Sequence, residues 1–385
     1  GEVALAVILL VGAGLMIRTL GALRKVDPGF DPSNVYTFTA TLPNAAYPEL
    51  EQQHRFAVAV EDRLRALPGV SDVGLSFGLP LTETRFSLSF TVRGRPNPPA
   101  GEDMTGQMRV ATPGYFRALK IPLKRGRYIE ASDVAGSQQV VVVSEELVRR
   151  YFPNEDPLGL YLDVGWERDG VTLGGTIVGI VGDVRHAGLN EDVEPFYYTA
   201  ESQWPFDEPT FVVRTTGAPA SVAQAVQEVV RSLDAQLPIF DAQPLTEIVS
   251  ASVAQQRFLG RILSLFSFLA VALSAIGIYG VVAYGVEQRR RELGVRLALG
   301  ASRDRVLGLV LGEGLRLALM GGVLGIGGAL ALTSLLKTVL FGVHPSDPIT
   351  LVSVAGLLIG VAMVASLAPA LRAARLHPTS ALREN

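Results

Sequence analysis

The chain has 385 residues, a mean hydropathy of +0.31 and 18% charged residues, so it is too apolar for an ordinary soluble protein and too polar to lie wholly within a membrane. A formal net charge of -3 argues against nucleic acid as a partner, because nucleic-acid-binding domains carry a strongly basic face. The lack of cysteine excludes thiolate catalysis, thiolate metal sites and disulfides.

Four apolar segments are predicted to cross a membrane as helices. Residues 1–20 are apolar after Glu2 but lack the basic flank and the cleavage site of a signal peptide. We interpret them as a first membrane helix that is truncated or starts differently. The other three segments, 262–286, 306–336 and 349–371, each supply the roughly 20 apolar residues that a crossing needs.

The placement of arginine predicts the orientation, because Arg and Lys are retained on the cytoplasmic side of a membrane. The loop between the second and third segments is rich in arginine, the next loop offers only Lys337, and the C-terminal tail is basic again. Residues 21–258 are therefore predicted to lie outside the cytoplasm. The arginines of the first loop are Arg289, Arg290, Arg291, Arg296, Arg303 and Arg305, and those of the tail are Arg372, Arg375 and Arg383.

The middle of the chain alternates short β-like runs with amphipathic helices, the pattern of an α+β fold. One set of elements has the β-α-β-β order that starts a ferredoxin-like unit, and a β-α-β set follows late in the chain. The first set comprises 35–42, 47–67, 70–77 and 86–92, and the second comprises 211–215, 219–233 and 237–240. Between them we expect an inserted unit with strands at 140–143 and 176–184 and a helix at 144–151 capped by Ser144, and we expect the junction in the Pro- and Gly-rich segment 93–101.

The sequence predicts no catalytic and no metal-binding residue. The sequence has no Gly-Lys pair for a phosphate-binding loop and no histidines at zinc spacing. Asp183 and His186, in the segment GIVGDVRH, are the one candidate acid-base pair, and we interpret them as hydrogen-bonded turn residues. A membrane-anchored enzyme is therefore the least favoured hypothesis.

The segment 287–315 predicts a short amphipathic helix at the cytoplasmic surface, because Leu293, Leu297 and Ala301 recur on one face. The remaining faces carry charge, at Arg289, Glu292, Arg296 and Arg303. From the residues alone, two interpretations stay open: an anchor that obeys the charge rule, or a docking site for a cytoplasmic partner.

Two features of the third and second membrane segments bear on packing and charge. Glu313 and Arg316 lie one helical turn apart, so we predict an intramembrane charged pair, with a role in conduction as the alternative. Small residues at fixed spacing predict close helix packing, at Gly321, Gly325 and Gly328 and at Gly277 and Gly280.

The segment RRRELGVRLALGAS, residues 289–302, resembles the signature block of FtsX-like permease domains. Further segments resemble the same MacB/FtsX-like family of ABC permeases in the same order along essentially the whole chain. They are VDPGF (26–30), PGYFRALKIPLKRGR (113–127), YFPNEDPLG (151–159), LFGVHPSDP (340–348) and APALRAARLHPTSALR (368–383). The likeness is to one half of a duplicated orphan ABC permease.

The resemblance implies an α-helical membrane protein with four transmembrane helices and an α+β extracytoplasmic domain, in which a ferredoxin-like porter carries an inserted small subdomain. It places the first transmembrane helix at 1–20 and the periplasmic core domain at 21–258. The porter is expected at about 30–110 and 205–250, the insert at about 111–204, and the permease domain at 259–385. The protein is expected to be a multi-pass protein of the bacterial cytoplasmic (inner) membrane, with its large domain periplasmic or extracellular.

The resemblance also implies an efflux permease that works by mechanotransmission and is not itself an enzyme. A separate cytoplasmic ABC ATPase would hold ATP and Mg, and a coupling helix at 289–302 would contact it. Further expected partners are a second permease half or a second copy, membrane lipid and a periplasmic adaptor. The alternative is a regulatory scaffold that controls a cell-wall hydrolase without transport. The expected coupling residues are Arg289, Arg290, Arg291, Glu292, Leu293, Arg296, Leu297, Gly300, Ala301 and Ser302.

Overall fold

The structure is a computed structural model that describes residues 1–82, 84–96, 99, 101–168, 170–299, 301–332 and 340–375. The chain forms two compact units. The helical unit comprises residues 1–25 and 253–385, and the sheet unit comprises residues 26–252.

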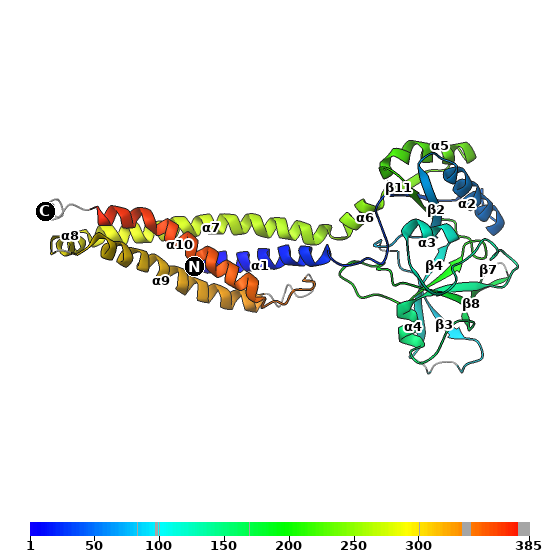
Figure 1. Cartoon of the computed structure of the whole chain (residues 1–385), viewed down its shortest axis with the longest axis horizontal. Coiled ribbons are helices and arrows are strands. Elements are labelled where there is room, and N and C mark those ends of the chain that lie inside the picture. The colour runs from blue at the N-terminus through cyan, green and yellow to red at the C-terminus, as the bar shows by residue number, and fades with distance from the viewer. Residues whose placement is uncertain are drawn as a thin grey trace. The chain divides into compact units, whose positions relative to one another are not determined.

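Among the described residues, four helices of the helical unit are long and apolar enough to cross a membrane, which confirms the four predicted membrane helices (Figure 1). One of them, α7, has 35 residues, so it extends over about 52 Å and exceeds the ~30 Å of a hydrocarbon core. Of the predicted third segment, residues 333–336 lie outside the described residues. The helices of this unit are α1 (Glu2–Leu23), α7 (Ala254–Gln288), α8 (Arg290–Ala298), α9 (Arg303–Leu332) and α10 (Pro348–Ala374).

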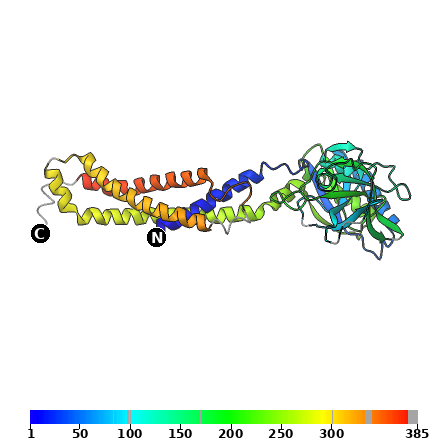
Figure 2. The ribbon, with the colours of Figure 1, turned by 90° about the horizontal axis from the view of Figure 1, so that it is seen from below.

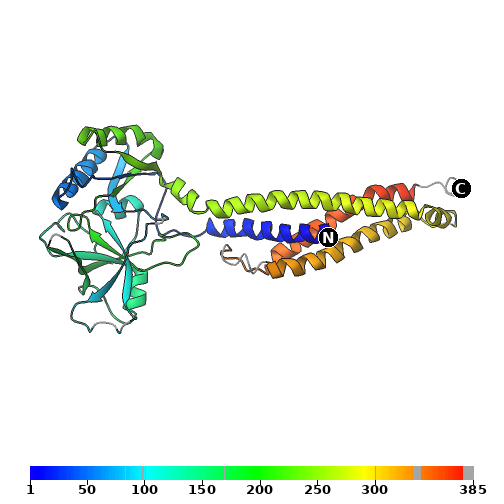
Figure 3. The same ribbon diagram turned by 180° about the vertical axis from the view of Figure 1, so that it is seen from behind.

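Glycines bring α1 and α9 close together, and Figures 2 and 3 show α1 alongside the longer helices from two further sides. A Cβ atom added at Gly325 would lie 2.4 Å from the Cβ of Val7, and one at Gly321 would lie 2.6 Å from the Cβ of Val3. The predicted close packing along α9 is therefore confirmed. It is wrong for Gly280, where a Cβ atom would meet nothing within 4 Å.

Part of the sheet unit is ferredoxin-like, as the sequence predicts. Its strands pair antiparallel in the order β11-β1-β10-β2, and one crossover helix follows β1 while another follows β10. The short α6 (Leu245–Ser252) ends this unit. The elements are β1 (Val35–Ala40), α2 (Leu50–Arg65), β2 (Val70–Phe77), β10 (Pro209–Thr215), the 3₁₀ turn Pro219–Val222, α5 (Ala223–Leu233) and β11 (Ile239–Pro244).

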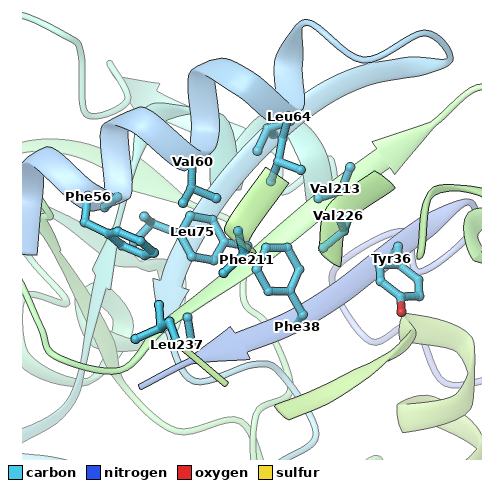
Figure 4. Packing of buried hydrophobic residues seen from close by; sticks show 14 of the residues in the cluster. Tyr36, Phe38, Phe56, Val60, Leu64, Leu75, Phe211, Val213, Val226 and Leu237 are labelled. Carbon is cyan, nitrogen blue, oxygen red and sulfur yellow. The ribbon is translucent and has the colours of Figure 1, made fainter. Parts of the chain in front are cut away.

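The core of the ferredoxin-like part lies between its sheet and its two helices (Figure 4). The rings of Phe38 and Phe211 stack with centroids 4.9 Å apart on neighbouring strands. Val60 and Leu64 of α2 and Val226 of α5 cover them and are at most 1% exposed. The apolar stripes predicted for the two helices are thus the faces that the fold buries.

The other strands form a second part inserted between β2 and β10. Six of them, β4, β3, β7, β8, β6 and β9, pair in a closed ring, because β9 returns to pair with β4 in parallel. Strand β4 of this ring pairs with β2 of the ferredoxin-like sheet at Ala111 and Ser76. The inserted elements are β3 (Ser87–Val92), β4 (Met104–Ala111), α3 (Pro113–Leu119), β5 (Leu123–Gly126), β6 (Val140–Ser144), α4 (Glu145–Tyr151), β7 (Tyr161–Arg168), β8 (Val171–Val181) and β9 (Phe196–Ala200).

One strand assignment is wrong. The segment 86–92, expected as the third ferredoxin strand, is β3 and pairs with β4 and β7 of the ring. The third ferredoxin strand is β10, and the segment 93–101 joins two ring strands, so it is not a junction between subdomains. Alternating apolar residues identify a strand, but they do not identify its partner. The predicted cap is confirmed, since the Oγ of Ser144 accepts a hydrogen bond from the backbone N–H of Leu147 at 3.3 Å.

Candidate functional site

The short helix α8 lies at the turn between two membrane helices. Only Arg289 separates it from α7, and α9 begins at Arg303. Leu293 is 2% exposed and belongs to a buried cluster with side chains of α7, α9 and α10. Leu297 packs against the same cluster. The apolar face predicted for this segment is therefore the face that α8 turns toward the membrane helices.

The opposite face of α8 is open to solvent. Glu292 and Arg296 are both about half exposed and form an ion pair at 2.5 Å, one helical turn apart. Val295 and Leu299 are 41% and 83% exposed, so this face also carries apolar surface. A mixed polar and apolar surface of this kind can receive a protein partner. Among the remaining predicted coupling residues, Arg290 and Ala301 are half-buried, Arg291 and Ser302 are exposed, and Gly300 lies outside the described residues.

Glu313 has a different partner from the predicted one. Its carboxylate forms an ion pair with the guanidinium of Arg289, which ties the start of α8 to α9. Arg316 is exposed and makes no ion pair within the described part of the chain. Sequence spacing favoured Arg316, which is on the same helix as Glu313. The packing of the helices instead brings Arg289, at the turn between α7 and α8, next to Glu313.

Asp183 and His186 do not form an acid-base pair. Asp183 accepts a hydrogen bond from the backbone N–H of Glu146 at 2.6 Å and pairs with Arg149 at 3.1 Å, so it holds the start of α4. His186 is 4% exposed and stacks on Phe196, with ring centroids 3.9 Å apart. Burial holds the pKa of His186 well below its usual value. The interpretation of these residues as structural is confirmed.

The sheet unit contains a cavity of about 820 Å³, which was not predicted from the sequence and which we call the α2 cavity. His54, Glu61 and Glu201 are among the titratable side chains that line it. The Nδ1 of His54 lies 2.7 Å from the Oε2 of Glu201, and Glu61 accepts a hydrogen bond from the hydroxyl of Thr112 at 2.6 Å. The sequence offers one signal for the cavity. His54 and Glu61 are seven residues apart in α2, so they lie on the same face of a helix that was predicted from its apolar stripe alone.

Burial and mutual charge shift the pKa values of all three groups. Burial, together with the nearby charge of Glu201, raises the pKa of Glu61 to about 7. Burial also raises the pKa of Glu201, although the hydrogen bond from His54 opposes this. That hydrogen bond in turn raises the pKa of His54. The cavity therefore holds three groups with raised pKa values, two of which, His54 and Glu201, are joined by a hydrogen bond.

The described residues contain no group of three His, Cys, Asp or Glu side chains that could hold a metal ion. We therefore identify two candidate sites: α8 with its ion pairs, and the α2 cavity with its buried acids.

Two family models match the chain. The model of the MacB-like periplasmic core domain matches residues 3–232, more than half of the chain, and that of the FtsX-like permease C-terminal region matches residues 264–378. The second match includes α8, and the first includes the whole α2 cavity.

Curated proteins and solved structures also match. A probable syringafactin export ATP-binding/permease protein of Pseudomonas syringae pv. tomato is 28% identical over 292 residues, which cover 73% of this chain and 42% of that protein. An uncharacterized ABC transporter permease of Bacillus subtilis is 24% identical over 289 residues, 70% of this chain and 68% of that one. The periplasmic region of MacB from Actinobacillus actinomycetemcomitans aligns with 61% of this chain and 97% of its own, at 17% identity and a TM-score of 0.39. The chain spans less than half the length of the export protein that it matches.

Proposed function

This chain belongs to the family of MacB- and FtsX-like permeases, and on that premise we propose that it transmits the motion of a cytoplasmic ATPase to its periplasmic domain in order to export a substrate. It is a multi-pass protein of the inner membrane and a permease of the ABC type. The proposal concerns how it works: which segment receives the motion, and which path the motion takes.

The burial of Leu293 is the observation that carries the proposal. Its side chain belongs to the same buried cluster as Val282 of α7, Val306 of α9 and Ala370 of α10, so we expect a displacement of α8 to disturb a core that these three membrane helices share. The ion pair between Arg289 and Glu313 adds a second connection to α9. We therefore expect a force applied to the exposed face of α8 to reach the membrane helices through this cluster and this ion pair.

The path from α8 to the periplasmic domain is α7. This helix runs without interruption from Ala254 to Gln288, and Val253 alone separates it from α6 of the sheet unit. A continuous helix transmits displacement along its axis better than a loop does, because its backbone hydrogen bonds hold its length fixed. We assign ATP and Mg²⁺ to an ATPase outside the present sequence, since residues 1–385 contain no Gly-Lys pair of a phosphate-binding loop.

Export is the direction that the relatives favour, because the named Pseudomonas relative is an export protein. Two further partners are proposed, a second permease half or second copy and a periplasmic adaptor. A regulatory scaffold would use the same path without cargo. The two functions separate in one experiment, because only export requires a substrate to leave the cell.

The test uses charge reversal on the exposed face of α8 in cells that also express the cognate ABC ATPase. Arg296→Glu removes the ion pair with Glu292 and reverses the surface charge, so we expect the permease to lose co-purification with the ATPase and export to fall at least about tenfold. Arg231→Glu, an exposed arginine on α5, is the matched control and should change neither.

A second variant separates docking from transmission. Leu293→Ala leaves the exposed face intact but removes the buried contact, so we expect the ATPase to bind while export falls. Export at the wild-type level in both variants would overturn the assignment. Activation of a cell-wall hydrolase that is lost in both variants, with no cargo exported by the wild type, would replace export by the scaffold function.

A further inference from the structure

We infer that the α2 cavity is a binding site for an organic cation with an apolar body. The inference goes beyond the proposed function, because binding at this site requires neither an ATPase nor transport. It follows from the size of the cavity, from its apolar walls and from the two buried carboxylates that line it.

The walls suit the apolar part of such a molecule. Ala57, Leu75 and Ile129 line the cavity and are at most 2% exposed, so they form its inner surface. Val58 and Val134 line it as well and are 41% and 47% exposed, which places apolar side chains at an open side. A volume of about 820 Å³ falls in the range of sites that enclose drug-sized molecules.

The carboxylates suit the charged part. Glu61 and Glu201 are 9% and 4% exposed, so both acids are nine-tenths buried. Glu201 has one oxygen, Oε2, near His54, and in the part of the chain that the structure describes its other oxygen accepts no hydrogen bond. This second oxygen is accessible and not fully buried, so a cation that enters the cavity can approach it directly.

Two of the three arginines that line the cavity are paired with acids outside the lining. Arg127 is held by Asp133, with N–O distances of 2.7 and 2.9 Å, and Arg117 lies 3.4 Å from Asp72. The third arginine of the lining, Arg65, pairs with Glu61 at 3.2 Å but also with Asp62 at 3.1 Å. Glu130 adds a further exposed acid to the lining. The charge left over is therefore negative, which favours a cation over an anion.

The charge of the cavity also sets the direction of its pH dependence. As the pH rises through about 7, Glu61 loses its proton. His54, whose pKa is raised by its hydrogen bond to Glu201, also loses its proton at higher pH. Both losses make the cavity more negative. If only the form with Glu61 ionised binds, the apparent affinity for a permanent cation increases about tenfold between pH 6 and pH 8.

The experiment compares two probes of the same shape and opposite charge, tetraphenylphosphonium and tetraphenylborate, on the full chain in lipid nanodiscs. Equilibrium dialysis of each radiolabelled probe at pH 6 and pH 8 gives its affinity, and empty nanodiscs give the lipid background. We expect saturable binding of the phosphonium that strengthens about tenfold at pH 8, and no saturable binding of the borate.

Three variants locate the site, and one serves as a control. Glu61→Gln and Glu201→Gln should each weaken phosphonium binding at pH 8 at least about tenfold, and Glu61→Gln should remove most of the pH dependence. Ala131→Trp, at an exposed position of the lining, should block the cavity without touching either acid. Glu228→Gln, an exposed acid on α5, should behave as the wild type.

Phosphonium binding that is unchanged in Ala131→Trp and in both glutamine variants would overturn the inference, as would equal saturable binding of the borate. Because Ala131→Trp leaves both carboxylates in place, loss of binding in that variant cannot be attributed to removal of a buried acid. The assay contains no ATPase, so its failure leaves the proposed transmission through α8 untouched, and the reverse also holds.

Discussion

The two units of this protein bury opposite kinds of side chain. In the sheet unit the large aromatic residues are inside, and Phe38 and Phe211 have no exposed surface. In the helical unit Phe268 is 70% exposed and Val364 73% exposed, whereas Ser366 is fully buried. The sheet unit folds in water, which drives apolar surface inward, while lipid surrounds the helical unit and gives no such drive. Contacts between membrane helices therefore select small residues that let backbones approach.

Acidic residues differ in the same way between the units. The sheet unit buries Glu61 and Glu201 beside a cavity, while the helical unit keeps Glu292 of α8 and Glu313 of α9 partly exposed, at 50% and 36%, and each paired with arginine. A buried acid with a raised pKa changes its charge when the pH or its neighbours change, whereas an exposed paired acid keeps its negative charge and presents it to a partner. The difference matches the two roles proposed, ligand binding outside and docking inside.

The largest expected effect contrasts two phenylalanines. Phe211→Ala should lower the free energy of unfolding of the sheet unit by about 3–5 kcal/mol, because it leaves a cavity beside Phe38. Both tryptophans, Trp166 and Trp204, lie in the sheet unit, so their fluorescence during guanidinium unfolding reports this unit alone. Phe268→Ala, which faces lipid, should change stability by less than about 0.5 kcal/mol. A similar loss in both variants would break the comparison.

The next effect is the pH dependence that Glu61 gives the sheet unit. Its pKa is raised from 4.5 to about 7, so the folded state keeps a proton that the unfolded state releases between these values. Stability is therefore lost as the pH rises from about 4.5 to 7, by roughly 3 kcal/mol in total. Glu61→Gln should remove this fall, so unfolding midpoints of the wild type and the variant diverge across the window. Parallel curves would show that Glu61 titrates normally, and Glu228→Gln is the matched control.

The smallest effect concerns glycine in the helical unit. A Cβ atom at Gly325 would lie 2.4 Å from Val7 and 2.8 Å from the carbonyl oxygen of Ala4, so Gly325→Ala should destabilise the unit by about 1–3 kcal/mol. At Gly322 a Cβ atom meets nothing within 4 Å, so Gly322→Ala should be neutral or stabilise by up to about 1 kcal/mol. Thermal loss of helical circular dichroism in detergent measures both. Equal midpoints would mean that α1 does not pack closely on α9.

Local patterns were sufficient for much of the fold. The four membrane helices follow from runs of apolar residues, the buried stripe through Val60 and Leu64 from helical periodicity, and the cap at Ser144 from a single hydroxyl before a helix. Each of these depends on residues within a few turns of one another, so the sequence states them directly. The face of α8 that carries Leu293 belongs to the same class.

The tertiary structure alone decided which distant segments meet. In the structure β10 pairs with β1 and β2, and the inserted strands close into a ring. Glu313 forms an ion pair with Arg289, and Glu201 and Glu61 both line the α2 cavity. Each of these contacts joins residues that are far apart in the chain, and its energy depends on packing, burial and charge summed over many neighbours. Periodicity along one segment determined the elements of this protein, and the contacts between elements determined its sites.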